Sequence, residues 1–107
     1  MSDLSPREAA DLLREGEAQL VDVREPYEHE AGRIAGDLHI ELERLSAAAD
    51  SIDRDRAVVF YCRSGTRSEL AAQAFAASGY RAHNLTGGLK AWVADGLPIE
   101  PTDGRVA

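Results

Sequence analysis

Hydrophobic and polar residues alternate along the chain in a way that predicts helices and strands in turn. The first helix is expected to begin at Ser5, because Ser5 and Glu8 have the spacing of a capping box and Pro6 occupies the first helical position. Apolar residues at helical spacing follow, and Gly16 ends the run.

Four short stretches have the pattern of strands. The stretch from 57 to 61 is apolar at nearly every position, which is typical of a strand buried on both faces of a parallel sheet. The acidic stretch 25–30 is expected to be a solvated loop or a short helix. We expect strands at 19–24, 37–40, 57–61 and 81–85, and further helices at 41–49, at 68–78 and from Gly87 to Gly96.

This alternation predicts the architecture. Helical segments of roughly 10–15 residues between strands imply parallel pairing through right-handed crossovers. We therefore predict one α/β domain, residues 1–107, with a small open parallel sheet covered by helices on both faces. Its core spans about 5–98, and 99–107 is expected to be a surface tail. In such sheets ligands bind beyond the carboxyl ends of the strands, so residues just after each strand are candidates for a site.

The 19 acidic and 12 basic residues give the chain a net charge of −7. Such a field repels nucleic acid and anionic membranes, so neither is expected as a partner, although the placement of the basic residues still allows a local basic site. The longest unbroken apolar run, 57–62, is far shorter than the roughly 20 residues that span a bilayer. No secretory signal is visible near Met1, and we expect a cytoplasmic protein.

The remaining motifs predict neither a metal nor a cofactor. His29, His39 and His83 are scattered and lack the spacing of a metal-binding pair. The pair Gly87-Gly88 lacks the Gly-Lys-Ser/Thr continuation of a phosphate loop, so a tight turn is expected there.

Cys62 is the only cysteine, so it cannot form an internal disulfide, and a reducing compartment is the natural setting. It follows the apolar strand and precedes a short turn and a helix. The helix N-terminus, the flexible Gly65 and the charges of Arg63 and Arg67 each favour the thiolate, so we expect a pKa below the unperturbed value of about 8.5. The alternative is a small buried residue of the core.

The spacing around this cysteine separates two chemistries. Cys62 and Arg67 are related as C-x4-R, whereas the signature of protein tyrosine phosphatases is C-x5-R. The shorter loop is expected to fit a tetrahedral phosphate poorly and to fit a single sulfur atom on the cysteine better.

Four segments together resemble a rhodanese domain of the single-domain thiosulfate sulfurtransferase type. The resemblance covers roughly Ser5 to Pro98. The cysteine loop and the Gly-Gly-x-x-x-Trp segment at its observed distance are the specific part. The segments are Leu20-Val21-Asp22-Val23-Arg24-Glu25, Tyr27-Glu28-His29-Glu30-Ala31-Gly32-Arg33-Ile34-Ala35-Gly36, Val59-Phe60-Tyr61-Cys62-Arg63-Ser64-Gly65-Thr66-Arg67-Ser68 and Leu85-Thr86-Gly87-Gly88-Leu89-Lys90-Ala91-Trp92.

The resemblance implies a five-stranded parallel sheet and a cysteine that carries sulfur. Cys62 is then the catalytic residue, and the donor is held by the loop residues Arg63, Ser64, Gly65, Thr66, Arg67 and Ser68. In the related dual-specificity phosphatases of this fold the loop is one residue longer.

The chain departs from the family pattern at two places. The family commonly has Gly-His-Ile-x-Gly-Ala where this chain has Arg33 and Asp37 at the second and last positions, and Asn-Ile where this chain has His39-Ile40. These positions shape a neighbouring loop and the approach to the site, so they bear on the choice of acceptor.

The family chemistry predicts a sulfurtransferase, with a small anionic sulfur donor and a thiol or protein-cysteine acceptor. Asp22 and Arg24 are expected to support the loop, either by orienting it or as a stabilising ion pair between neighbouring loops. One alternative is a persulfide carrier that receives sulfur from a partner protein with little turnover of free thiosulfate. Another is a phosphatase or arsenate reductase, which the missing loop residue disfavours.

Overall fold

The computed structural model describes residues 1–107 and contains a single sheet of five strands. All four strand pairings are parallel, and the order across the sheet is β1-β5-β4-β2-β3. This arrangement confirms the open parallel α/β sheet that the sequence predicts. The strands are β1 (Ser2–Leu4), β2 (Ala18–Asp22), β3 (Leu38–His39), β4 (Ala57–Tyr61) and β5 (Ala82–Leu85).

Four helices connect or follow these strands: α1 (Pro6–Arg14), α2 (Pro26–Ala31), α3 (Thr66–Ala77) and α4 (Gly88–Ala94). The first helix has the predicted capping box, because the Glu8 N–H donates to Ser5 Oγ and the Ser5 N–H donates to Glu8 Oε1. No helix combines the length and the apolar character that crossing a bilayer requires.

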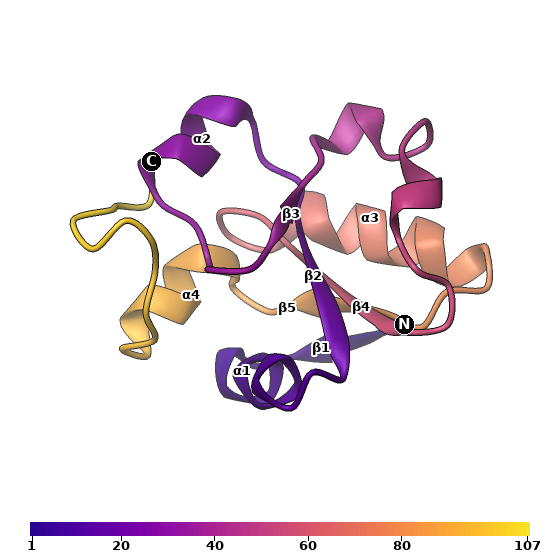
Figure 1. The fold of residues 1–107 in the computed structure, drawn as a ribbon, viewed down its shortest axis with the longest axis horizontal. Helices are drawn as coiled ribbons and strands as arrows, with labels where there is room; N and C mark the ends of the chain where they lie inside the picture. Colours follow the sequence, from indigo (N-terminus) through magenta and orange to yellow (C-terminus); the bar gives the residue numbers. More distant parts are fainter.

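Two hydrophobic cores lie on opposite faces of the sheet (Figure 1). Helix α3 and the chain that connects β3 to β4 cover one face, and helices α1 and α4 cover the other. Every residue of β4 is buried, because this strand is central and packs against both layers. The carboxyl end of β4 therefore lies at the centre of the sheet, and the residues that follow this strand begin there.

The predicted helix at 41–49 is wrong. The segment forms two 3-10 turns instead, Leu42–Arg44 and Ala49–Ser51. The Leu42 N–H donates to Val23 O, which ties the start of the segment to the end of β2. Leu45 and Ile52 are both buried in the same core, and two tight turns bring both side chains inward while the chain returns along the sheet.

Strand β1 is absent from the sequence prediction. It has only three residues, and two of them are exposed, so it carries no alternating hydrophobic signal. Its position is set by parallel pairing with β5, where Ser2 is opposite His83 and Leu4 is opposite Leu85. The edge strand is thus defined by backbone pairing rather than by burial.

Residues 99–107, which we call the strap, lie along the outside of α2 and α4 (Figure 1). Glu100 and Arg33 exchange two backbone hydrogen bonds in an antiparallel bridge, and the Arg105 N–H donates to Ala31 O. Val106 packs against the core beneath α4. This segment therefore follows a fixed path over the surface.

Candidate active site

Cys62 lies at the carboxyl end of β4, at the junction between strand and helix that the sequence predicts. Its side chain is 1% exposed. Gly65 forms the N-cap of α3 with a φ of 101°, a left-handed conformation that glycine adopts without steric cost. The turn between strand and helix therefore folds back over the sulfur.

Hydrogen-bond donors of this turn surround the Cys62 sulfur. The Gly65 N–H lies 3.1 Å from Sγ, and Ser68 Oγ lies 3.4 Å from it. Burial raises the pKa of the Cys62 thiol, but hydrogen bonds from Ser68 and from the backbone N–H groups of Gly65 and Ser64 outweigh burial and hold the pKa below its usual value. The loop thus favours the reactive thiolate.

The Ser68 hydroxyl has only one proton and two neighbours to receive it. Asn84 Oδ1 is 2.6 Å from Ser68 Oγ, much closer than the sulfur. The Asn84 amide is oriented by its Nδ2, which donates to Gly65 O, so its oxygen must face the serine. The Ser68 hydroxyl therefore donates its proton to Asn84 Oδ1 in a hydrogen bond, and the backbone N–H groups are the main donors to the thiolate.

Ser68→Ala should therefore cost stability more than thiol acidity. The variant leaves the buried Asn84 oxygen without a donor, which destabilises the fold by about 1–3 kcal/mol. The pKa of Cys62 should change little, because the backbone donors remain. Denaturant unfolding and the pH dependence of Cys62 alkylation by iodoacetamide measure the two effects. A strongly raised thiol pKa at unchanged stability would show that the hydroxyl donates to sulfur instead.

The Gly87-Gly88 segment supports the cysteine loop from behind. The Leu89 N–H donates to Cys62 O, and the Lys90 N–H donates to Arg63 O. A Cβ on Gly88 would lie 2.5 Å from Cys62 O, closer than real Cβ contacts come, so only glycine permits this approach. The turn expected at this position is present, and it also fixes the backbone on which the sulfur is mounted.

The two loop arginines differ in their partners. Arg67 forms two hydrogen bonds of 2.8 Å to the carboxylate of Glu28 on α2, and Glu28 is 3% exposed. The Glu28 Oε1 also accepts the Glu25 N–H, so this carboxylate joins the start of α2 to the start of α3. The Arg67 hydrogen bonds lower the pKa of Glu28 more than burial raises it, which keeps the pair ionised.

Arg63 is exposed, and its Nε donates to Ala107 O at the end of the strap. It forms no ion pair with an Asp or Glu side chain. The sequence suggested that both Arg63 and Arg67 would hold an anionic donor. Since the charge of Arg67 is balanced by Glu28, Arg63 has the positive charge that is available for that role.

Asp22 and Arg24 form a fully buried ion pair. Arg24 Nε and Nη2 donate to the two carboxylate oxygens at 2.9 and 2.8 Å, and Nη2 also donates to Gly32 O at 2.6 Å. The expected ion pair is present, although its two residues lie two positions apart at the end of β2 rather than on neighbouring loops. The pair anchors the residue that follows α2 to the edge of the sheet.

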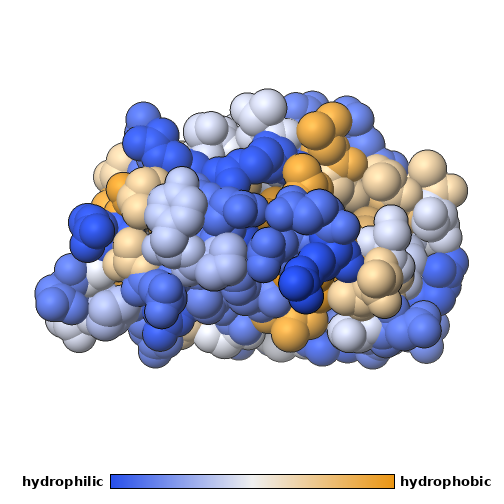
Figure 2. Space-filling model, turned by 90° about the horizontal axis from the view of Figure 1, so that it is seen from above, coloured by the Kyte–Doolittle hydropathy of each residue, from blue (hydrophilic) through white to orange (hydrophobic).

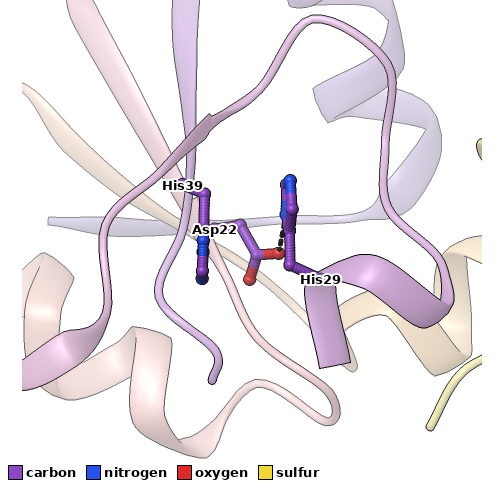
Figure 3. A group of neighbouring side chains, drawn as sticks. All are labelled: Asp22, His29 and His39. Atoms are coloured by element: carbon purple, nitrogen blue, oxygen red, sulfur yellow. Dashed lines mark hydrogen bonds and ion pairs between the residues drawn. The ribbon is translucent and has the colours of Figure 1, made fainter. Parts of the chain in front are cut away.

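Two histidines that are separate in sequence come together beside Asp22 (Figure 3). The rings of His29 and His39 stack with centroids 4.3 Å apart and planes 8° from parallel. The His29 Nδ1 is 2.9 Å from Asp22 Oδ2, and the His39 Nε2 is 2.7 Å from Arg24 O. Possible metal-ligand atoms of Asp22, His29 and His39 all lie within 4.8 Å of one another.

The orientation of the rings favours hydrogen bonding over metal binding in this cluster. A histidine nitrogen binds a metal in the plane of its ring, and two parallel stacked rings do not direct their nitrogens to a common point (Figure 3). Asp37 extends the network, because its Oδ2 accepts the Tyr61 hydroxyl at 2.6 Å and lies 3.6 Å from His29 Nδ1. Asp37 and His39 therefore both belong to the hydrogen-bond network around Asp22 and Arg24.

A polar pocket of about 200 Å³ lies beside the cysteine loop. Ser64, Gly65 and Thr66 line it together with the carboxylates of Asp3 and Glu69. Negative charge on this side disfavours an anionic donor, so Arg63 marks the more favourable side of approach.

Sequence reasoning missed Glu28 and Asn84 as supports of the loop. Glu28 had one visible signal, because it stands three residues after Glu25 with a proline between them, which is the spacing of a helix start. Asn84 is a buried amide within a short buried strand, and such an amide requires hydrogen-bond partners.

This chain is similar in sequence and in structure to known proteins. Residues 5–95 match the rhodanese-like domain family, a span that includes the cysteine loop and Gly87-Gly88. A protein of Allochromatium vinosum named sulfurtransferase is 42% identical over 86 residues, 79% of this chain and 80% of that protein. The thiosulfate sulfurtransferase GlpE of Glaesserella parasuis is 29% identical over 100 residues, 92% and 93% of the two chains. A crystal structure of a rhodanese-like domain protein from Staphylococcus aureus has a TM-score of 0.80 at 28% identity and covers 86% of this chain and 91% of that one.

Proposed function

We infer, because this chain belongs to the rhodanese-like domain family, that it is a sulfurtransferase that works through a persulfide on Cys62. The donor is thiosulfate or a related sulfane compound, and the acceptor is a thiol or a protein cysteine. The observation that carries this proposal is the lone thiol at the strand end, with loop donors around its sulfur and a lowered pKa. A reducing cytoplasmic setting keeps such a thiol available.

In the first half of the reaction the Cys62 thiolate attacks the outer sulfur of thiosulfate. A new bond forms between Sγ and that sulfur, the S–S bond of thiosulfate breaks, and its electron pair leaves with sulfite. Arg63 holds the anionic donor, and the backbone N–H groups of the loop stabilise the persulfide anion. Since Cys62 is 1% exposed, the groups around the loop must open slightly for the donor to reach Sγ.

In the second half a thiophile removes the sulfur. The persulfide takes a proton from solvent, and an acceptor thiolate attacks its outer sulfur. The bond to Sγ breaks, and the electron pair returns to Cys62 as thiolate. No oxidant or reductant is consumed, and the two halves together predict ping-pong kinetics.

Intact mass spectrometry tests this proposal directly. Incubation with thiosulfate should add the mass of one sulfur atom and release one sulfite per protein, and cyanide should then remove that sulfur as thiocyanate. Absence of both the added mass and the sulfite would overturn thiosulfate as the donor. Loading only from the persulfide of a cysteine desulfurase would establish a carrier role in place of thiosulfate turnover.

A further inference from the structure

Four basic residues belong to segments that hydrogen bonds join to one another on the side of the cysteine loop that the strap borders. The Lys90 N–H donates to Arg63 O, and Arg63 Nε donates to Ala107 O. Arg105 is two residues before Ala107, and its N–H donates to Ala31 O, two residues before Arg33. We call Arg33, Arg63, Lys90 and Arg105 the basic rim.

No acidic side chain pairs with the basic rim. None of its four residues forms an ion pair with an Asp or Glu, although the chain has 19 acidic residues and a net charge of −7. Three of the four are exposed, and Arg33 is half-buried. The strap also carries Glu100 and Asp103, so positive charge is in excess here while negative charge is in excess over the whole chain. A local excess of this kind attracts anionic partners.

The strap brings one rim residue into place by close contact. A Cβ on Gly32 would lie 2.3 Å from Arg105 O, so the strap crosses Gly32 at a distance that only glycine allows. The close approach at Gly32 therefore fixes the backbone that carries Arg105.

The surface seen from above, on the side where α2 lies, is mainly hydrophilic, with its most hydrophobic residues in small separate patches (Figure 2). This face therefore offers a partner no large continuous apolar surface. Charged residues at the edge of an interface chiefly increase the rate of association and select partners by complementarity.

We propose that the basic rim is the docking surface for an acidic acceptor protein whose thiol takes the sulfur from Cys62. This inference rests on the proposed function. The acceptor thiolate attacks the outer sulfur of the Cys62 persulfide, a new S–S bond forms, and the electron pair of the broken bond returns to Sγ. The proton of the persulfide stays on the transferred sulfur, and the acceptor leaves as its own persulfide.

Two cysteine peptides of equal length test the proposal, one with aspartate and glutamate around the cysteine and one with serine and glycine in their place. The readout is the ratio of the transfer rates to the two peptides from the loaded protein. The ratio should exceed one at low salt and fall toward one at high salt. In Lys90→Glu/Arg105→Glu it should drop about tenfold, because the attraction is reversed.

The matched control is Arg14→Glu/Arg81→Glu, which changes the net charge equally. Arg14 ends α1 and Arg81 precedes β5, so both lie near the amino ends of the strands, away from the cysteine loop. This control should keep the wild-type ratio. An unchanged ratio in the rim variant, or an equal drop in the control, would overturn the docking surface.

Gly32→Ala supplies a second variant that moves the strap without changing any charge. The φ of Gly32 is −179°, extended backbone that alanine adopts, so the added Cβ acts mainly by pushing the strap away. The ratio should fall here too. Loading is measured first on every sample by intact mass, and inorganic polysulfide supplies the sulfur if thiosulfate does not. A failure of thiosulfate loading is thus separate from a failure of docking.

Discussion

Cys62→Ser should abolish sulfur loading and lower sulfur transfer by at least about a thousandfold, because the reaction needs a thiolate and a serine hydroxyl does not ionise near neutral pH. The fold should survive, since the Gly65 N–H that faces Sγ can donate to a hydroxyl oxygen instead. The measurement is sulfite release from thiosulfate together with intact mass before and after incubation.

The composition of the chain makes this experiment unusually clean. Cys62 is the only cysteine, so sulfur gained by the wild type and absent from Cys62→Ser has one possible site. Gly16→Ala is unsuitable as a control because of its positive φ, whereas Ser46→Ala is an exposed change far from the loop and should load normally. Sulfite release by Cys62→Ser at the wild-type rate would exclude a Cys62 persulfide.

The position of the cysteine loop was predictable because its signals lie in consecutive residues. An apolar strand, one cysteine, a turn with Gly65 and an alanine-rich helix define the loop without any distant contact. The contacts that complete the loop are not local. Glu28 reaches Arg67 across 39 positions, and Asn84 reaches Ser68 across 16, so both depend on where α2 and β5 lie in the fold.

The histidine pair likewise could not be predicted from local sequence. His29 and His39 have no spacing that relates them, because one lies on α2 and the other on β3. Parallel pairing of β2 with β3 places Asp22 opposite His39, and α2 brings His29 over both. Only the tertiary arrangement turns two separated histidines and an aspartate into one network.

The second large effect is expected at the buried ion pair. Asp22→Ala should destabilise the fold by about 3–5 kcal/mol, because it leaves the charge of Arg24 without a counter-ion inside the protein. Arg24 Nη1 already lacks a hydrogen-bond partner, so the guanidinium is not fully satisfied even with Asp22 present. The midpoint of thermal unfolding should fall by roughly 12–20 °C. Sulfur loading per folded molecule should change far less, since Asp22 does not contact Cys62.

The pH dependence of this loss has a defined sign. Burial raises the pKa of Asp22, but the hydrogen bonds and charge of Arg24, together with His29, outweigh burial and hold the pKa below its ordinary value. A carboxyl whose pKa is depressed by folding stabilises the protein fully above its unfolded pKa of about 3.9, and this contribution disappears as the pH falls through the folded value. The difference in unfolding midpoint between wild type and Asp22→Ala should therefore shrink as the pH falls into the acid range.

The double variant Asp22→Ala/Arg24→Met separates the orphaned charge from the lost contacts. Removing both partners eliminates the uncompensated cation and places an apolar chain of similar length over the Tyr61 ring, where the Arg24 guanidinium lies at 5.4 Å. Replacement of a whole buried pair is often close to neutral, so the double variant should recover most of the stability that Asp22→Ala loses. If it is no more stable than the single variant, or if Asp22→Ala stops sulfur loading at an unchanged unfolding midpoint, Asp22 orients the loop rather than stabilising the fold.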